Sequence, residues 1–324
     1  MESRELGRSG IEVSRLILGC GNFGGVGSSP AFFGKGTSHD DALRLLDNAW
    51  ELGITTFDTA DAYGGGTSES WLGEWLRKKG SDVRDRVVVT TKTFNPMTEG
   101  ADHGLSHARV VRQLEASLTR LGLERVPLYM THAHDPDTPQ EETLEAFAEL
   151  IRAGKIGAVG ASNYTAEQLA EGLELAALER LPRYEWVQNS FSLLEHNDRE
   201  TVFPLCHEHG IGYTPFSPLA GGWLTGKYRR NAEPPAGSRM TKRPEPYAGF
   251  TTDRVFTALE RFEEHAAAKN VSMAALALAW LLATPEITAV VVGPNTVEQF
   301  APVAESLAVH LTGSEHHKLA ELFA

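Results

Sequence analysis

The sequence predicts an α/β fold, a single (β/α)8 or TIM barrel in which eight parallel strands alternate with helices. Two observations support this. Eight short runs rich in β-branched and apolar residues alternate with longer segments of helical periodicity, which is typical of βα units around a parallel sheet. No linker or low-complexity tract interrupts the alternation, and a barrel of this kind readily reaches 324 residues. We therefore expect one domain over residues 1–324.

The elements follow one another in a regular order. Residues 4–13 read as a hairpin with a glycine-containing turn, placed before the first barrel strand. The expected strands are 16–19, 55–58, 87–92, 128–132, 156–162, 186–190, 212–216 and 289–293. The expected helices are 40–52, 70–78, 106–121, 140–153, 166–179, 199–209, 253–269, 272–282, 296–307 and 314–323.

Local signals mark the ends of several of these helices. Thr165 is of the residue type that caps a helix N-terminus, here the helix 166–179. Gly53, Gly122 and Gly154 each follow a helix, where a left-handed residue ends the last turn. One long connection, 219–251, shows no regular pattern and is rich in Gly, Pro, Arg and Lys. Loops of that length in a compact domain usually serve a function.

Bulk composition limits the kinds of partner. The formal net charge is -13 and the pI is about 5.4, which argues against a nucleic-acid partner. The two cysteines, Cys20 and Cys206, indicate a reducing compartment rather than a disulfide framework. The N-terminus lacks a signal-peptide pattern, and the longest apolar run, 273–283, is too short to span a bilayer. We expect a cytoplasmic protein without a membrane partner. The oligomeric state cannot be read from the sequence, because no exposed apolar stripe stands out.

Four polar side chains stand at the ends of three successive predicted strands. Asp58 ends the second strand and Tyr63 follows five residues later; Lys92 ends the third strand and His132 the fourth. The C-terminal ends of barrel strands converge on one mouth, where active sites are built. We therefore expect the four side chains to meet.

These side chains suit the reduction of a carbonyl group, which needs a hydride on carbon and a proton on oxygen. A free tyrosine, with a pKa of about 10, releases its proton reluctantly. The Lys92 ammonium would stabilise the phenolate of Tyr63 and lower that pKa, and Asp58 would hold Lys92 charged. His132 would hydrogen-bond the substrate oxygen.

The motifs around these positions resemble those of the aldo-keto reductases, barrel enzymes that use NADPH to reduce aldehydes and ketones. The resemblance rests on FDTADAYG at 57–64, on Lys92 and on LYMTH at 128–132, and it extends over nearly the whole chain. It implies a catalytic tetrad of Asp58, Tyr63, Lys92 and His132. Tyr63 and His132 would also contact substrate, together with Phe23, and the loop 94–105 would form a pocket wall.

The resemblance also implies a cofactor site. In GASNY at 160–164, Ser162 and Asn163 would hold the nicotinamide carboxamide together with Gln188, and Phe216 would stack on the ring. Phosphate groups would face the backbone at Ser217, Leu219 and Gly221, with charge from Lys227, and Arg239 would face the 2′-phosphate. The remaining expected contacts are Gly21, Asn22, Gly293, Asn295, Thr296 and Gln299. NADPH is the expected cofactor, with NADH second.

The chain departs from the family pattern at several positions. Pro302 and Val303 stand where many members have Glu and Asn, which usually grip the adenine, and Asn295 stands where Arg or Ser is common. Ala133 replaces a frequent Trp after the catalytic histidine, which removes a bulky wall. The substrate itself is not specified by these motifs.

Other interpretations of the same residues are weaker. Gly19, Gly21 and Gly24 match the Rossmann fingerprint, but Gly, Ser and Pro follow instead of a helix start. His132, His134 and Asp135 offer metal-ligand types that would need further convergent ligands, as in a metal-dependent hydrolase or isomerase. Lys92 alone would suit a Schiff-base aldolase. A further alternative is an NADPH-binding regulatory subunit resembling the potassium-channel β subunits, which share the fold and the tetrad.

Overall fold

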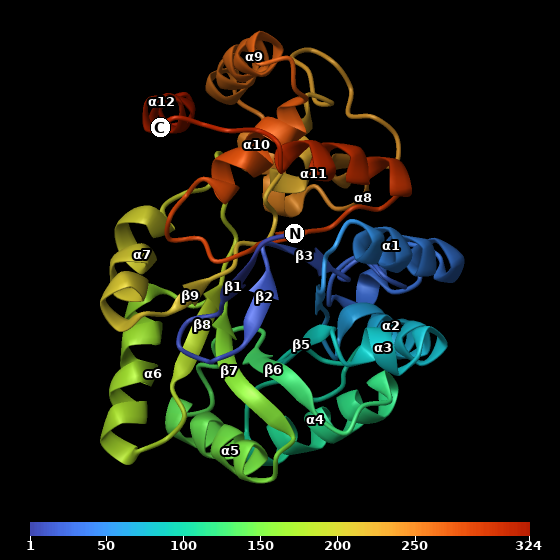
Figure 1. Cartoon of the computed structure of the whole chain (residues 1–324), viewed down its shortest axis with the longest axis vertical. Coiled ribbons are helices and arrows are strands. Elements are labelled where there is room, and N and C mark those ends of the chain that lie inside the picture. The colour runs from blue at the N-terminus through green and yellow to red at the C-terminus, as the bar shows by residue number, and fades with distance from the viewer.

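A ring of parallel strands forms the centre of the computed structural model, which describes residues 1–324 (Figure 1). The strands are β3 (Leu16–Gly19), β4 (Thr56–Asp58), β5 (Val88–Thr93), β6 (Val126–Thr131), β7 (Ile156–Ser162), β8 (Tyr184–Gln188), β9 (Gly212–Tyr213) and β10 (Val290–Val292). They pair in the order β10-β3-β4-β5-β6-β7-β8-β9. The N–H of Thr288 donates to Tyr213 O and that of Val291 to Pro215 O, both at 2.9 Å. These bonds join the first strand in that order to the last, so the predicted barrel is confirmed.

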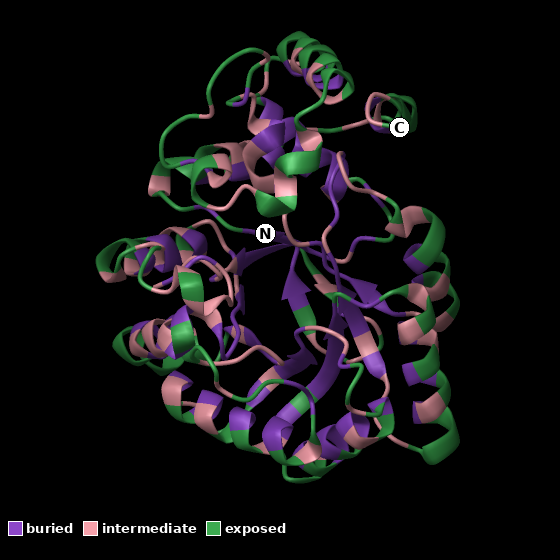
Figure 2. Cartoon of the chain, turned by 180° about the vertical axis from the view of Figure 1, so that it is seen from behind, coloured by how far each residue is buried: buried purple, intermediate pink, exposed green.

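Helices surround the ring. They are α1 (His39–Glu51), α2 (Thr67–Lys79), α3 (Ser81–Arg84), α4 (His107–Leu121), α5 (Gln140–Arg152), α6 (Ala166–Glu179), α7 (Asp198–His209), α8 (Arg239–Lys242), α9 (Asp253–Ala268), α10 (Met273–Leu282), α11 (Phe300–Ser306) and α12 (Gly313–Glu321). Figure 2 shows buried strands at the centre and exposed residues on the outer faces of the helices. This is the pattern expected when amphipathic helices cover a parallel sheet.

The predicted helix ends are largely confirmed. Thr165 caps α6 in a capping box with Gln168, and Gly53, Gly122 and Gly154 have φ of 85°, 67° and 70°. The predicted start of the second helix was wrong, because α2 begins at Thr67 directly after a glycine turn.

The segment expected as one helix over 296–307 is divided in two. It forms a short 3-10 turn, Val297–Gln299, followed by α11. Pro302 lies in the first turn of α11, where its missing N–H leaves no hydrogen bond unmade.

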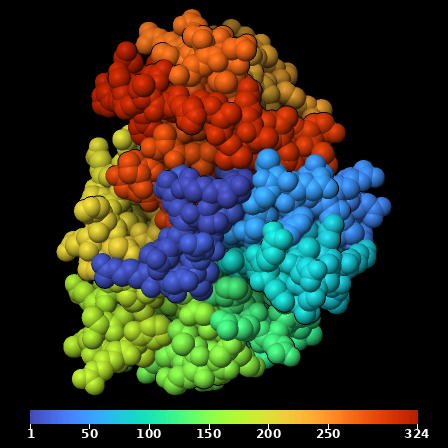
Figure 3. Space-filling view, in the orientation of Figure 1, coloured from blue at the N-terminus to red at the C-terminus, as the bar shows by residue number.

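The predicted N-terminal hairpin is confirmed, and it closes one end of the barrel. Its strands β1 (Ser3–Glu5) and β2 (Glu12–Ser14) pair antiparallel, and in Figure 3 the N-terminal segment covers the middle of the ring. Leu6 and Val13 form one buried cluster with residues inside the barrel: Ile17, Leu128, Met130, Ala158, Trp186, Ala289 and Val291. Because the hairpin fills the end where the strands begin, the C-terminal ends remain available for a site.

The long connection after β9 carries more regular structure than the sequence indicated. It contains two 3-10 segments, Ala220–Thr225 and Glu245–Phe250, besides α8.

The apolar run 273–283 forms α10, whose residues 273–281 are all buried, as expected. No single helix has the length and apolar character needed to cross a membrane; α9 and α10 meet that test only jointly, with a bend of 88° between them. After β3 the chain forms only the 3-10 turn Pro30–Phe32 before α1.

Packing inside the barrel makes a stability prediction. A Cβ added at Gly160 in β7 would lie 2.5 Å from the ring of Trp186, so Gly160→Ala forces the indole to move. We expect a loss of about 1–3 kcal/mol in the free energy of unfolding, as for overpacked cores. Urea denaturation measures it. In α12, Gly313→Ala is the control, because its added methyl meets nothing within 4 Å. Equal stability of the two variants would contradict the packing described here.

Candidate active site

The structure brings the four predicted catalytic side chains together at the open end of the barrel. Lys92 lies on β5, and its Nζ donates to Asp58 Oδ2 on β4 at 2.6 Å and to the Thr59 carbonyl oxygen at 2.9 Å. The same Nζ lies 3.4 Å from the hydroxyl oxygen of Tyr63. The imidazole of His132, directly after β6, meets the Tyr63 ring edge-on, with 5.2 Å between the ring centroids. One ammonium group thus contacts both the carboxylate and the phenol.

A turn of three glycines places Tyr63. Gly64, Gly65 and Gly66 have φ of 58°, 65° and 93°, a left-handed region that residues with a Cβ rarely adopt. A Cβ on Gly64 would also lie 2.7 Å from Phe23 O. The turn leads directly into α2, so the phenol is held over the strand ends rather than on a free loop.

Burial dominates the electrostatics of Tyr63. Burial raises the pKa of its phenol more than the neighbouring Lys92 ammonium lowers it, and the Asp58 charge adds to the increase. The expectation that Lys92 lowers this pKa is therefore right for the lysine's own effect but wrong for the net direction. The phenol keeps its proton at neutral pH.

The pKa values of the two neighbouring bases, Lys92 and His132, are shifted in opposite directions. Burial alone would lower the pKa of Lys92, but the Asp58 carboxylate and the Tyr63 oxygen raise it overall, which keeps the ammonium charged. Burial and the charge of Lys92 hold the pKa of His132 well below its usual value, so its imidazole is neutral. Its Nδ1 is buried and has no hydrogen-bond partner.

A large cavity opens beside these residues, with a volume of about 1590 Å³. Its lining includes Asp58, Tyr63 and His132. Most of the predicted cofactor residues also line it: Gly21, Asn22, Gln188, Phe216, Ser217, Leu219, Gly221, Lys227, Arg239, Gly293, Asn295, Thr296 and Gln299. Three of the four predicted catalytic side chains and most of the predicted cofactor residues therefore share one cavity.

Several residues predicted for the site do not line this cavity: Phe23, Lys92, Ser162, Asn163 and the whole loop 94–105, which was expected to form a pocket wall. Ser162 is buried and donates its hydroxyl hydrogen to Gln188 O at 2.8 Å. Asn163, with φ of 58°, is exposed and donates from Nδ2 to His132 O at 2.9 Å. The ring of Phe23 is buried in the main hydrophobic core.

Backbone conformation on one wall of the cavity favours an anion. Ser217 and Ala220 have φ of 55° and 47°, and Gly221 and Gly222 follow with 63° and 94°. Successive residues in turn and left-handed conformations direct N–H groups into a concavity that binds phosphate oxygens. This segment, which follows β9, is therefore suited to a phosphate chain.

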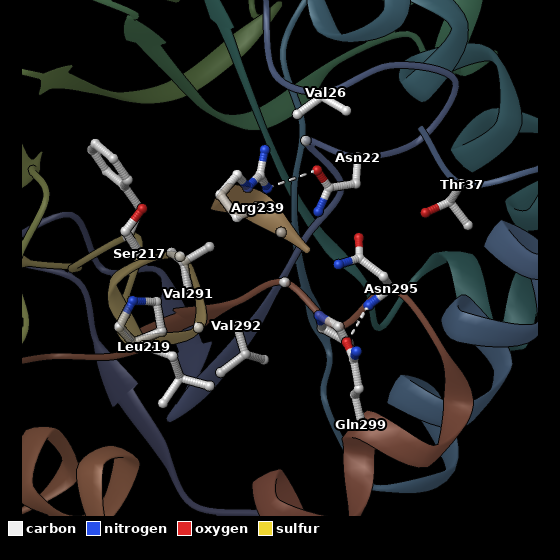
Figure 4. Close-up of a pocket in the computed structure, with 18 of the residues that line it drawn as sticks. Asn22, Val26, Thr37, Ser217, Leu219, Arg239, Val291, Val292, Asn295 and Gln299 are labelled. Atoms are coloured by element: carbon white, nitrogen blue, oxygen red, sulfur yellow. Dashed lines mark hydrogen bonds between the residues drawn. The ribbon is translucent and has the colours of Figure 1, made fainter. Parts of the chain in front are cut away.

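Two cations on the same loop face this cavity. Burial and the charge of Arg239 lower the pKa of Lys227, so the two cations disfavour each other inside the cavity. Figure 4 shows Arg239 reaching across to Asn22, where Nη2 donates to Oδ1 at 3.2 Å. The Asn295 N–H donates to Gln299 Oε1 at 2.8 Å beside them. An anionic ligand would relieve the repulsion between the two cations.

Sequence reasoning missed several parts of the site. Gln188 Nε2 donates to Asp58 Oδ1 at 3.2 Å, so it also holds the carboxylate that was predicted to be catalytic. Cavity-lining residues without any motif come from the loop before α1, from the first turn of α1 and from the segment after β9: Thr37, Ser38, Asp41, Lys242, Arg243 and Tyr247. Cations and an aromatic residue in the long 219–251 loop were the one available signal for the last three. No cluster of three or more His, Cys, Asp or Glu side chains is arranged to hold a metal ion.

Residues 15–324 match the model of the aldo/keto reductase family. The chain belongs to this family. It is 35% identical to an uncharacterized oxidoreductase, YrpG, of Bacillus subtilis strain 168, over all of this chain and 96% of that protein. It is 33% identical to L-glyceraldehyde 3-phosphate reductase of Escherichia coli K12, over 95% of this chain and 88% of that enzyme. It is 34% identical to a putative voltage-gated potassium channel subunit beta of Schizosaccharomyces pombe, over 91% of this chain and 85% of that protein.

Membership of the aldo/keto reductases confirms the resemblance found in the sequence, and the relatives named as oxidoreductases support an oxidoreductase. The family generally uses NAD(P)H as its cofactor.

The buried pair of Lys92 and Asp58 makes a prediction about stability. Asp58→Asn leaves the fully buried Lys92 ammonium without its counter-charge, which we expect to cost about 3–5 kcal/mol of unfolding free energy. Adding Lys92→Met removes the uncompensated charge, so the double variant should recover part of that loss. Urea denaturation of both variants checks this. A double variant less stable than Asp58→Asn alone would contradict a coupled ion pair.

Proposed function

We propose that this chain reduces an aldehyde or ketone to the alcohol with NADPH, and that Tyr63 is the general acid. The observation that carries the proposal is the contact of one buried ammonium, Lys92, with both Asp58 and Tyr63 at the wall of a large cavity. The reverse reaction, oxidation of the alcohol, uses the same groups.

The protein's own side chains account for the proton transfer. A carbonyl oxygen beside Tyr63 and His132 accepts a hydrogen bond from the phenol and takes its proton as negative charge develops on that oxygen. Lys92 then stabilises the phenolate, and Asp58 keeps Lys92 in place and charged. Neutral His132 positions the carbonyl oxygen without competing for the proton.

The volume and the polar lining of the cavity support a nicotinamide adenine dinucleotide cofactor. When bound, the cofactor supplies the hydride to the carbonyl carbon. The turn at 217–222 would hold the pyrophosphate with Lys227, and Arg239 would hold the 2′-phosphate. Gln188 would hold the carboxamide and Phe216 would stack on the ring, whereas Ser162 and Asn163, which donate to the Gln188 and His132 carbonyl oxygens, would support these residues from behind. The mutual repulsion of Lys227 and Arg239 supports a ligand that carries phosphate groups. NADH and NADPH both carry a pyrophosphate; the second cation, Arg239, favours the additional 2′-phosphate of NADPH.

A regulatory role is the second candidate. The similarity to a protein named as a putative potassium channel subunit beta favours it. In that role the chain would bind NADPH tightly and turn it over slowly on every carbonyl. The two functions differ in turnover, which makes them separable by kinetics.

Replacing the proposed proton donor tests the enzyme function. In Tyr63→Phe we expect NADPH oxidation with aldehydes, ketones and sugars to fall about 10²–10⁴-fold, the usual contribution of a general acid, with NADPH affinity within a few-fold. Tyr184→Phe is the matched control, since its hydroxyl donates to Gln140 on α5 and lies outside the cavity lining. Steady-state absorbance at 340 nm measures both. Wild-type protein that binds NADPH but reduces no carbonyl would instead support the regulatory role.

A further inference from the structure

A group of charged side chains lies between the barrel and its helices, a layer that is normally apolar. Arg109 on α4 and Asp61, two residues before Tyr63, are 2% and 0% exposed. Burial raises the pKa of Asp61 to about 7, which shows that ionising this carboxyl costs free energy. Asp61 Oδ1 and Arg109 Nε have no hydrogen-bond partner. Apolar residues would fill this space at lower cost, so the charges call for a role beyond packing.

Arg109 joins the two ends of the loop 94–105. Its Nη2 donates to Asn95 O at 2.8 Å and its Nη1 to Gly104 O at 2.9 Å. The Gly104 N–H donates to Phe94 O at 2.8 Å, and Gly104 has φ of 97°, so the loop closes on itself. A single planar guanidinium thus fixes both ends of the loop, which its fork of donors permits.

A hydroxyl links this clamp to the catalytic residues. Thr93 Oγ1 accepts from Arg109 Nη1 at 2.9 Å and donates to Asp61 Oδ2 at 2.6 Å. The Asp61 N–H donates in turn to Lys92 O at 3.0 Å. The chain of bonds therefore runs from the loop to the backbone of Lys92 and to the turn that carries Tyr63.

The loop also touches that turn directly. A Cβ added at Gly65 would lie 3.3 Å from Met97 O, and one added at Gly66 would lie 3.3 Å from Met97 Cε. On the other side, Asp135 Oδ2 accepts from the Leu105 N–H at 2.7 Å. Asp135 follows His132 by three residues, so the loop is attached next to both residues proposed to contact the carbonyl oxygen.

We propose that Arg109, acting through Thr93 and Asp61, is a positioning residue that fixes the loop 94–105 against the Tyr63 turn. Through the positions of Tyr63 and His132, to which the loop is attached, it sets the size of carbonyl substrate accepted. The inference about substrate size rests on the proposed reductase function; the clamp itself does not. The predicted cofactor residues follow β3 and β7 to β10, and none of them lies in the loop 94–105 or in the clamp, so we expect the clamp to affect carbonyl substrate more than cofactor.

A pair of variants at Thr93 isolates the link. Thr93→Val keeps the volume and removes the hydroxyl, whereas Thr93→Ser keeps the hydroxyl. In Thr93→Val we expect hydrogen exchange of the Gly104 and Leu105 amides to speed up about tenfold, as for the loss of a hydrogen bond to charged groups. We also expect KM for bulky ketones to rise about tenfold, with KM for a small aldehyde and NADPH affinity changing less than threefold. Thr93→Ser should restore all values to within about twofold.

Arg15→Lys provides the structural control. Arg15 is a buried arginine at the opposite end of the barrel, bonded to the carbonyls of Leu282, Ile287 and Thr288, and its replacement should lower stability without changing KM for any substrate. Unchanged exchange of residues 94–105 in Thr93→Val would overturn the clamp. An equal rise in KM for the small aldehyde and the bulky ketones, together with an equal loss of NADPH affinity, would overturn the positioning role. If the wild-type protein reduced no carbonyl, the proposed function would fail, while the exchange measurement would still decide the clamp.

Discussion

The buried ammonium of Lys92 is the interaction on which the rest of the site depends. Removing this charge from water is costly, and the cost is offset only because Asp58 and the Thr59 carbonyl accept two of its hydrogen bonds. The position of the charge fixes where a phenolate can be stabilised. Tyr63 is placed there by a turn that only glycines readily form. The strand ends, the turn and the ion pair thus form one unit rather than four independent residues.

The two ends of the barrel divide stability and chemistry between them. Leu6 and Val13 fill the end where the strands begin. The other end carries polar side chains, left-handed turns and the cavity. Buried charge extends outward from this end through Thr93 to Arg109 and Asp61. The polar part of the protein therefore reaches from the cavity into the layer between strands and helices, and there it contacts the loop 94–105.

The sequence predicted the fold well because its determinants are local. Alternating strand and helix patterns, the cap at Thr165 and the glycines after helices each depend on residues close in the chain. The tetrad was recognisable because Asp58, Tyr63, Lys92 and His132 each follow or end a strand. The chemical roles of these four residues remain predictions. Their closeness in space, however, was predictable from barrel geometry alone.

What the sequence could not show depends on contacts between distant segments. The bond from Gln188 to Asp58 crosses the barrel. Arg109 is linked to Asp61 through Thr93 only because α4 packs on β5. The direction in which the pKa of Tyr63 shifts depends on how fully the surrounding chain excludes water. No sequence motif encodes that degree of burial. Phe23 was expected in the substrate pocket, and packing from several elements instead places its ring in the core.

Titration of Tyr63 itself tests the central claim most directly. With tyrosine labelled at Cζ, carbon-13 NMR can follow each of the seven phenols, and Tyr63→Phe identifies the signal. We predict that Tyr63 stays protonated up to at least pH 10, the ordinary tyrosine pKa, because burial raises its pKa. In Lys92→Met its pKa should rise further, because the cation that stabilises the phenolate is gone. An unchanged or lower pKa in that variant would contradict the account.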